Sequence, residues 1–346
     1  MPNDPDQNAP GLAGLGEEGL LRRIRDRAPQ DHPRLIRGIG DDAAVIAGAE
    51  RTLVTTDLLI ENVHFRRDRS LPRLLGRKLV AVNLSDIAAM GGTPAFAFLT
   101  LAAPADFPLA DTDEIVAGVI ERCAGEKVCL AGGDLSRAGL LFLSLTLMGS
   151  AALPAPVYRS GARPGDDLYL TGELGGAALG LQRLHALASP LTAEMLAGDE
   201  YAGALRRQLD PPARLAAGQA LAGRATAMMD LSDGLLTDLP RLLRESGGLG
   251  AVIEIDRLPL DPDLRRCRAH PDQPTRDELA LVLAGGEDYE LLFTAAPGGI
   301  AGEVAGLAVT RIGAVRRRPG IELVNRRGEP VPPPPPLFEH FRGPGR

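Results

Sequence analysis

Apolar and polar positions along the N-terminal half of the chain alternate between the period of a strand and that of a helix. Continuous apolar runs are typical of buried strands, whereas apolar residues that recur every three or four positions are typical of helices. The predicted strands cover 51–60, 95–103, 128–134 and 140–150, and the predicted helices begin at Glu17 and cover 72–90 and 112–124. The Gly91-Gly92 pair closes the long central helix. This order predicts one α/β unit.

A second unit with the same alternation follows a proline-rich break. Three prolines in the segment 152–166 precede the strand DLYLTG and predict a domain boundary near 150–160. Further strands are predicted at TAMMD and AVIEID, a helix follows DLSDG and stops at Gly247-Gly248, and 278–295 reads as helix, tight turn and strand. We expect domains at 17–152 and 153–346, after a disordered tail at 1–16.

Composition and charge exclude several classes of protein. At 346 residues and 45% hydrophobic, the chain can bury a sizeable core. No apolar run approaches the roughly 20 residues that span a bilayer. The N-terminus lacks the blocks of a signal peptide, so we expect a cytoplasmic protein with no membrane partner. The formal charge of -7 argues against a nucleic-acid partner.

Cysteine and lysine usage narrows the chemistry further. The three cysteines have no metal-ligand spacing, which indicates neither a disulfide framework nor a zinc site. The only lysines, Lys78 and Lys127, stand outside any P-loop motif, so that kind of nucleotide site is excluded. Positive charge for binding phosphates must therefore come from another source.

Acidic residues gather beside glycine, serine or threonine in six motifs. These motifs are GDDAA, TTDLL, NLSDIAAMGG, AGGDLSR, MMDLSDG and AGGEDYE. Glycine allows close backbone approach to a ligand, and aspartate with a hydroxyl supplies oxygen ligands for a hard cation. One such motif alone is ordinarily an Asx-turn or a helix cap. Six together favour a ligand site, because Asp57, Asp86 and Asp230 interrupt apolar segments where an unpaired carboxylate is costly.

The ligand chemistry favours magnesium and a polyphosphate. Carboxylate and hydroxyl groups suit Mg²⁺ better than zinc or iron, and several Mg²⁺ ions suggest bridging of nucleotide phosphates. Asn83 and Asp86, three residues apart on the predicted helix, can face one site, although an exposed polar stripe is the alternative. The glycines of GELGGAALGL (172–181) fit either phosphate binding at a helix N-terminus or close packing of a helix on a strand.

Taken in order, the motifs resemble those of the thiamine-monophosphate kinase family. They are GIGDDAAVI, TTDLLIENVHF, KLVAVNLSDIAAMGGTPAF, GGDLSR, TGELGGAALGL, DLSDGLLTDL and AGGEDYELLFT, and the resemblance runs from about Gly38 to Phe341. It implies an α/β (α+β), two-domain PurM-like fold of the aminoimidazole-ribonucleotide-synthetase-like superfamily. In that fold the N-terminal domain dimerises to build a β-barrel, and the C-terminal domain closes over the nucleotide.

The resemblance also implies the roles of individual residues. Those expected around the Mg²⁺ ions are Asp42, Thr55, Thr56, Asp57, Asp86, Asp134, Asp230 and Asp233. Those expected to contact ATP are Gly133, Asp134, Arg159 and Ser232, and those expected to contact the substrate are His64, Glu287 and Phe338. No residue is expected to act as an acid or base, because the acceptor phosphate of a monoester is already largely ionised at neutral pH.

The reaction implied is transfer of the ATP γ-phosphoryl group to thiamine phosphate, giving thiamine diphosphate, by a homodimer. Aminoimidazole ribonucleotide synthetase is the alternative enzyme of this fold, and a non-catalytic nucleotide-binding module is the alternative of another class. Selenophosphate synthetase and the hydrogenase-maturation relative rely on cysteines near the N-terminus or in the C-terminal tail. Here no cysteine precedes Cys123, and the chain ends FEHFRGPGR.

Overall fold

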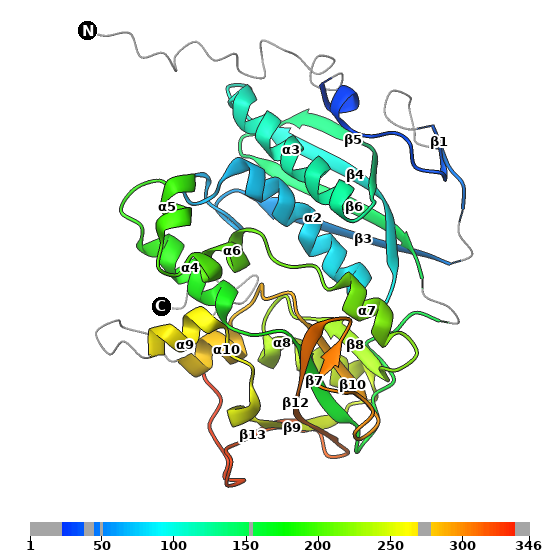
Figure 1. The fold of residues 1–346 in the computed structure, drawn as a ribbon, viewed down its shortest axis with the longest axis vertical. Coiled ribbons are helices and arrows are strands. Elements are labelled where there is room, and N and C mark those ends of the chain that lie inside the picture. The colour runs from blue at the N-terminus through cyan, green and yellow to red at the C-terminus, as the bar shows by residue number, and fades with distance from the viewer. Residues whose placement is uncertain (1–22, 38–44, 49–50, 152–154, 269–277, 336–346) are drawn as a thin grey trace. The chain divides into compact units, whose positions relative to one another are not determined.

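The computed structural model describes residues 23–37, 45–48, 51–151, 155–268 and 278–335, which fold into two compact units (Figure 1). The first unit contains the described residues up to Leu84, with Pro94–Ser150 and Ser189–Leu191. The second contains Ser85–Thr93, Ala151–Ala188 and the chain from Thr192 onward. Asp42 and Phe338, both predicted site residues, lie outside the described residues. In the described ranges, no helix is both long and apolar enough to cross a membrane.

The first unit is a four-stranded sheet with two helices on one face (Figure 1). Its strand order is β3-β6-β4-β5, with β3 antiparallel to β6 and β4 parallel to β5. A Cβ atom at Gly76 would overlap the carbonyl oxygen of Ile115, so glycine lets the two helices cross closely. The elements are β1 (Leu35–Arg37), β2 (Val45–Ile46), β3 (Thr52–Ile60), η2 (Arg67–Arg69), α2 (Pro72–Ala89), β4 (Thr93–Ala103), α3 (Leu109–Gly125), β5 (Cys129–Arg137) and β6 (Phe142–Ser150).

Burial alternates along the strands of this sheet, as expected for a sheet covered on one side. Leu143, Leu145 and Leu147 of β6 are fully buried. On the opposite face of β3, Val54 is 61% and Leu58 40% exposed. The sheet is open in the part of the chain that the structure describes, so a barrel built by two copies stays a prediction.

The second unit is a larger sheet packed against several helices. The strand order is β13-β9-β12-β7-β10-β8, with β11 on β12, and only β13 and β9 of these described strands pair in parallel. Its core joins residues of β7, β9 and β10 to residues of α4, α8, α9 and α10. The elements are β7 (Asp167–Thr171), α4 (Gly176–Ala186), α5 (Ala193–Gly198), α6 (Ala202–Leu209), α7 (Leu215–Leu221), β8 (Ala227–Asp230), α8 (Leu235–Glu245), β9 (Gly250–Glu254), η3 (Ile255–Arg257), α9 (Pro262–Arg268), α10 (Glu278–Ala284), β10 (Leu291–Ala295), β11 (Glu303–Val304), β12 (Leu307–Arg316) and β13 (Gly320–Val324).

One segment of the predicted N-terminal domain belongs to the second unit. Residues 85–93 are held there by Val157, whose N–H donates to Met90 O at 3.2 Å, and by Gln219, whose amide donates to Gly92 O at 3.0 Å. A Cβ at Gly218 would overlap the carbonyl oxygen of Ala88, so α7 lies directly against this segment. The C-terminal end of α2 and its Asp86 are therefore parts of the second unit.

Candidate active site

Thr55, Thr56 and Asp57 lie on the central part of β3 in the first unit. Thr55 and Asp57 pair with Leu147 and Leu145 of β6, so they share the face of those buried leucines. Thr56 points to the other face, where its hydroxyl lies 3.2 Å from Thr146 Oγ1 and accepts its hydrogen bond. The strand thus brings Thr55 and Asp57 to one side and places the Thr56 side chain on the opposite side.

Gly133 and Asp134 lie on β5 where this strand emerges from the core. Cys129, Leu130 and Ala131 are buried, whereas Gly133 and Asp134 are exposed. Any Cβ at position 133 would overlap the carbonyl oxygen of Leu99 on the paired strand β4, so only glycine fits. The AGGD motif therefore presents the exposed carboxylate of Asp134 next to the exposed main chain of Gly133.

His64 is fixed in the turn that follows β3. The Ile60 N–H donates to His64 Nδ1 at 3.1 Å, and the His64 N–H donates to Ile60 O at 2.9 Å. Because Nδ1 accepts, the neutral ring carries its proton on Nε2. Asn62 in the same turn has a left-handed backbone, with φ of 64°. The imidazole orientation is therefore set by the backbone of the turn itself.

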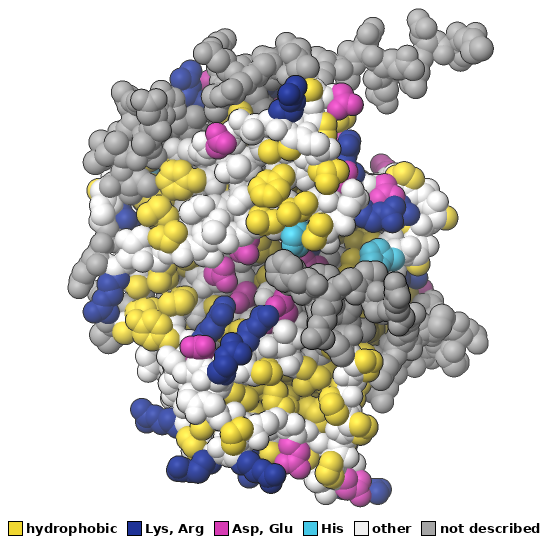
Figure 2. All heavy atoms as spheres, turned by 180° about the vertical axis from the view of Figure 1, so that it is seen from behind, with side chains coloured by type: hydrophobic (Ala, Val, Ile, Leu, Met, Phe, Trp, Pro, Cys, Tyr) yellow, Lys and Arg dark blue, Asp and Glu magenta, His cyan; other side chains and the backbone are white. Residues whose placement is uncertain are grey.

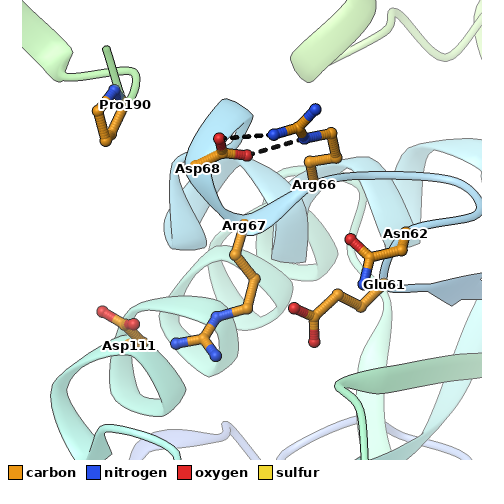
Figure 3. A pocket seen from close by; sticks show the side chains of 7 residues that line it. All are labelled: Glu61, Asn62, Arg66, Arg67, Asp68, Asp111 and Pro190. Atoms are coloured by element: carbon orange, nitrogen blue, oxygen red, sulfur yellow. Dashed lines mark hydrogen bonds and ion pairs between the residues drawn. The ribbon is translucent and has the colours of Figure 1, made fainter.

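A surface pocket of about 720 Å³ lies next to this turn in the first unit (Figure 3). Arg66 is paired with Asp68 through two hydrogen bonds of 3.0 and 2.9 Å, and Arg67 extends between Asp111 and Glu61. Burial raises the pKa of Asp111, and the Arg67 charge opposes that shift. The lining carries both signs of charge, so it selects neither an anion nor a cation by itself. It is formed by Glu61, Asn62, Arg66, Arg67, Asp68, Asp111 and Pro190.

In the second unit, Asp230 ends β8 as a nearly buried carboxylate, 4% exposed. It accepts a hydrogen bond of 2.7 Å from the Ser85 hydroxyl. Burial raises the pKa of Asp230 to about 7, and the charge of Asp86 adds to this shift. The Ser85 hydrogen bond and the charge of Arg159 oppose it. Two predicted site residues, Asp86 and Arg159, thus act electrostatically on a third, Asp230, within this unit.

The DLSDG turn carries the next two predicted residues, Ser232 and Asp233. The Asp233 N–H donates to Asp238 Oδ2 at 2.9 Å, and the Arg241 guanidinium contacts both carboxylates at 2.7 Å. Burial raises the pKa of Asp238 to about 6. The sequence prediction omitted Asp238 and Arg241. An acidic residue in the first turn of a helix complements the helix dipole and is the local signal for Asp238. Asp233 is therefore held by the beginning of α8.

Backbone hydrogen bonds join the DLSDG turn to the GGEDYE turn. The Glu287 N–H donates to Ser232 O at 2.8 Å, and the Tyr289 N–H donates to Leu231 O at 2.9 Å. Glu287 and Tyr289 both have left-handed backbones, with φ of 66° and 49°. Such conformations are uncommon for residues with side chains and occur where the surroundings enforce them. The structure thus brings Ser232 and Glu287 together within the second unit.

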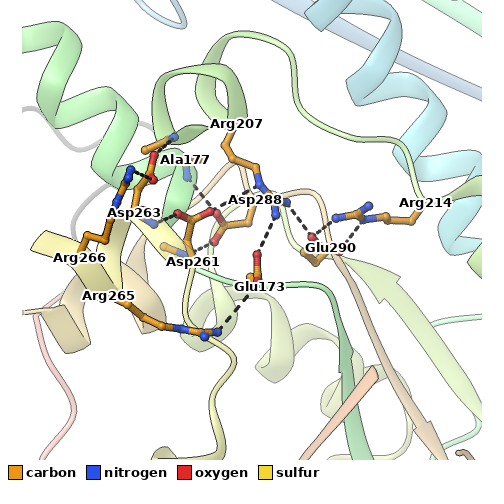
Figure 4. Close-up of polar contacts among 12 residues, drawn as sticks. Glu173, Ala177, Arg207, Arg214, Asp261, Asp263, Arg265, Arg266, Asp288 and Glu290 are labelled. Atoms are coloured by element: carbon orange, nitrogen blue, oxygen red, sulfur yellow. Dashed lines mark hydrogen bonds and ion pairs between the residues drawn. The ribbon is translucent and has the colours of Figure 1, made fainter. Parts of the chain in front are cut away.

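The N-terminus of α4, considered above as a phosphate site, is capped by Asp288 (Figure 4). Its carboxylate accepts from Gly175 N at 2.8 Å and from Ala177 N at 3.1 Å. Burial raises the pKa of Asp288 to about 7, and these two hydrogen bonds oppose the shift. A Cβ at Gly180 would overlap the Ala204 carbonyl oxygen on α6. A protein carboxylate at Gly175 and close packing at Gly180 therefore account for glycines of GELGGAALGL.

Glu290 is a fully buried carboxylate between two arginines (Figure 4). It accepts from Arg214 Nε at 2.7 Å, from Arg207 Nη1 at 3.0 Å and from Thr171 Oγ1 at 2.8 Å. Arg214 Nη2 also donates to it, and Arg207 contacts Glu173 at 3.2 Å. Sequence reasoning did not identify these arginines, because they are 83 and 76 residues from Glu290 and carry no motif.

The donor groups of the second unit fit a hard divalent cation. The charge of Asp86 disfavours ionisation of the buried Asp230, and a bound cation would relieve this effect. Carboxylate oxygen atoms are the ligands that Mg²⁺ prefers. Among the described residues, no three His, Cys, Asp or Glu side chains form a group that could hold a metal by itself.

Comparison with known families assigns both halves of the chain. Residues 40–151 match the N-terminal domain of AIR synthase related proteins, and residues 163–322 match the C-terminal domain of the same proteins. The chain is thus a two-domain protein of the AIR synthase-related class. A hydrogenase maturation protein, HypE of Escherichia coli, shares this fold with a TM-score of 0.68 at 17% identity.

Closer relatives define the family within this class. Thiamine-monophosphate kinase of Rhodopirellula baltica is 35% identical over 318 residues, which cover 88% of this chain and 91% of the relative. The enzyme of Escherichia coli K12 is 37% identical over 284 residues, covering 81% and 82%. The chain belongs to the thiamine-monophosphate kinase family.

Solved structures agree with this assignment. The crystal structure of thiamine-monophosphate kinase from Stenotrophomonas maltophilia has a TM-score of 0.78 at 33% identity and covers 92% of this chain and 98% of its own. A structure described as AaThiL complexed with AMPPCP and TMP has a TM-score of 0.73 at 32% identity and covers 94% and 97%.

Proposed function

We propose that the protein transfers the γ-phosphoryl group of ATP to thiamine phosphate and so forms thiamine diphosphate. The observation that carries this proposal is the similarity to a structure of AaThiL complexed with AMPPCP and TMP, which covers 94% of this chain. The acidic motifs of both units fall within the ranges that match the AIR synthase-related domains. Sequence relatives and residue chemistry therefore support the same reaction.

The reaction needs positioning and charge neutralisation more than acid–base chemistry. The second pKa of a phosphate monoester is near 6, so the acceptor oxygen is largely ionised at neutral pH. Each pair of like charges at ~4 Å repels by about 4 kcal/mol at an effective dielectric of about 20. Holding an anionic acceptor against a triphosphate is the main obstacle, and the residues of the site act by orienting both and by compensating their charge.

We propose that several Mg²⁺ ions are held by the aspartates and threonines of the acidic motifs. When bound, Mg²⁺ neutralises phosphate oxygens that face one another. Thr55 and Asp57 offer oxygen atoms on one face of β3, and Asp230 is held for this role by Ser85. The full proposed set is Asp42, Thr55, Thr56, Asp57, Asp86, Asp134, Asp230 and Asp233.

The remaining proposed residues bind the two substrates. Gly133 is proposed to contact ATP through its exposed backbone, because the Leu99 carbonyl of β4 occupies the place of its side chain. Arg159 supplies a positive charge on the side of Asp230. His64, with its ring fixed by Ile60, and Glu287, in its left-handed turn, are proposed to contact thiamine phosphate together with Phe338. Ser232 and Asp134 complete the proposed ATP contacts.

We also propose a cytoplasmic homodimer in which two copies of the first unit complete a β-barrel. The sheet face that carries Val54 and Leu58 is the surface proposed for this contact, because large apolar side chains exposed together indicate an interface. Figure 2 shows the side opposite to α2 and α3, with hydrophobic side chains gathered over the sheet. The functional domains proposed are 17–152 and 153–346.

A panel of acceptors tests the proposed reaction. The purified protein is incubated with Mg-ATP and, in separate reactions, thiamine, thiamine phosphate, an aminoimidazole precursor or selenide, and ADP and products are separated by chromatography. Thiamine diphosphate formed only from thiamine phosphate supports the proposal. Turnover of another acceptor in its place, or ATP binding without turnover, overturns it.

A further inference from the structure

We propose that Gln208 is a positioning residue that sets the orientation of the Glu287 carboxylate toward thiamine phosphate. This inference rests on the proposed function, in which Glu287 contacts the acceptor. Gln208 lies near the C-terminal end of α6 and is 4% exposed, and its amide Nε2 donates to Glu287 Oε2. All these groups belong to the second unit.

The chemistry of the pair fixes which way the amide points. An ionised carboxylate only accepts hydrogen bonds, so the NH₂ end of Gln208 must face Glu287. The carbonyl end, Oε1, is then buried without any hydrogen-bond partner. A buried unpaired oxygen destabilises the folded state, whereas an apolar side chain of the same length would not. Methionine, an apolar side chain of similar length, would fill this position without a buried unpaired oxygen. Glutamine differs from it in donating the hydrogen bond to Glu287.

The contact adds to hydrogen bonds that hold the main chain of this turn. Glu287 has a φ of 66°, and its N–H is bound to Ser232 O, so the main chain is fixed from the DLSDG side. Gln208 fixes the side chain from the other side. Its neighbour on α6, Arg207, binds Glu290 of the GGEDYE segment. Two consecutive residues of α6 therefore orient two carboxylates: Glu290, which is part of a buried ion pair, and Glu287, which is proposed to contact the substrate.

An oriented carboxylate suits the acceptor in this reaction. The organic part of thiamine phosphate carries a cationic ring and an amino group, and both favour a carboxylate held in one rotamer. Without the Gln208 amide, the Glu287 carboxylate would be held less firmly in this rotamer, and the loss would appear as weaker binding of the acceptor. ATP binding would not change, because no ATP group is proposed to meet Glu287.

Gln208→Met tests this assignment, with Gln219→Met as a control at an exposed glutamine of the same unit. The Gln219 amide donates to a main-chain oxygen, Gly92 O, and no hydrogen bond joins it to the GGEDYE turn among the described residues. For Gln208→Met we expect the KM for thiamine phosphate to rise about tenfold, as for the loss of one charge-assisted hydrogen bond. The KM for ATP should remain within twofold of wild type, and the melting temperature should be equal or higher. Gln219→Met should leave the KM for thiamine phosphate unchanged.

A double-mutant cycle with Glu287→Ala shows whether Glu287 mediates the effect. If it does, Gln208→Met has no further effect on the KM for thiamine phosphate once Glu287 is alanine. An unchanged KM in Gln208→Met, additive effects in the cycle, or equal losses for both substrates with a lower melting temperature would overturn the inference while wild-type turnover stands. Absence of thiamine diphosphate from the wild-type reaction would instead overturn the proposed function and this inference together.

Discussion

The Ser85 hydroxyl donates a 2.7 Å hydrogen bond to Oδ2 of Asp230, and both side chains are buried. This bond joins the C-terminal part of α2 to the end of β8 within the second unit. It lowers the pKa of Asp230 against the effect of burial, which raises that pKa to about 7. Ser85 therefore keeps more of Asp230 ionised at neutral pH than burial alone would allow.

Ser85→Ala should weaken the apparent binding of Mg²⁺ in a pH-dependent way. Without the hydroxyl the pKa of Asp230 rises further, so more of this proposed ligand is protonated at pH 6.5 than at pH 8.5. The Mg²⁺ concentration for half-maximal activity should rise most at pH 6.5 and approach the wild-type value at pH 8.5. The free energy of unfolding should fall by about 1–2 kcal/mol, because a buried acceptor loses its donor.

Mg²⁺ titrations of activity at several pH values measure this effect. Thr192→Ala is the control, since it removes a hydroxyl cap at α5, away from Asp230. An equal shift at every pH would contradict the role assigned to the Ser85 hydroxyl.

Glu290→Gln should destabilise the second unit strongly. The substitution leaves Arg207 and Arg214 without their shared buried carboxylate. Breaking a buried ion pair by removing one partner typically costs about 3–5 kcal/mol, and we expect the free energy of unfolding to fall by that amount. Urea unfolding measures it. Glu114→Gln, at a half-exposed pair with Arg73, should have a far smaller effect, and similar effects of the two variants would sink the interpretation.

Asp288 should make stability depend on pH in the direction opposite to most carboxylates. Its pKa is raised to about 7 in the folded protein, whereas an unfolded aspartate has a pKa near 3.9. The folded state therefore binds the extra proton, and the stabilisation is full below about pH 4 and is lost as the pH rises to about 7. Asp288→Asn cannot ionise, so its stability relative to wild type should increase between pH 4.5 and 7.5 and then level off. Urea unfolding curves of both proteins at each pH measure this difference. A difference in stability that stays constant between pH 4.5 and 7.5 would refute the assignment.

The cysteines should be unreactive in the native protein. Cys123, Cys129 and Cys267 are all buried, and burial raises the pKa of Cys123 to about 12 and also raises that of Cys129. The reactive thiolate of Cys123 is therefore scarce at pH 8. Mass spectrometry after iodoacetamide treatment should find no alkylation of the native chain and full alkylation in urea. Rapid labelling of Cys123 without denaturant would be inconsistent with this packing.

The elements with long apolar runs were predictable from local pattern alone. The expected strand at 51–60 and helix at 72–90 correspond to β3 and α2, because their burial depends on residues two, three or four positions apart. The short β11 and the helices α5 to α7 were not predicted, since their stability comes from packing on distant segments. Most candidate site residues were recognised where a motif surrounds them, whereas Arg159 and Phe338 were assigned through the family resemblance alone.

Residues that support the site through long-range contacts left no local signal. Asp288 caps a helix 113 residues away, and Gln208 binds Glu287 across 79 residues. The glycines near the start of α4 were correctly open to two interpretations, and only the position of Asp288 distinguishes them. Thr56 stands next to Thr55 in sequence, yet the strand turns its side chain to the opposite face.

The most direct test of the account is the product of the wild-type protein with Mg-ATP and thiamine phosphate. Chromatography of the reaction should show thiamine diphosphate and ADP in equal amounts, with no diphosphate when Mg²⁺ is chelated. Equal amounts are expected because each in-line transfer consumes one ATP. ATP consumption that yields inorganic phosphate without thiamine diphosphate would contradict the proposed function.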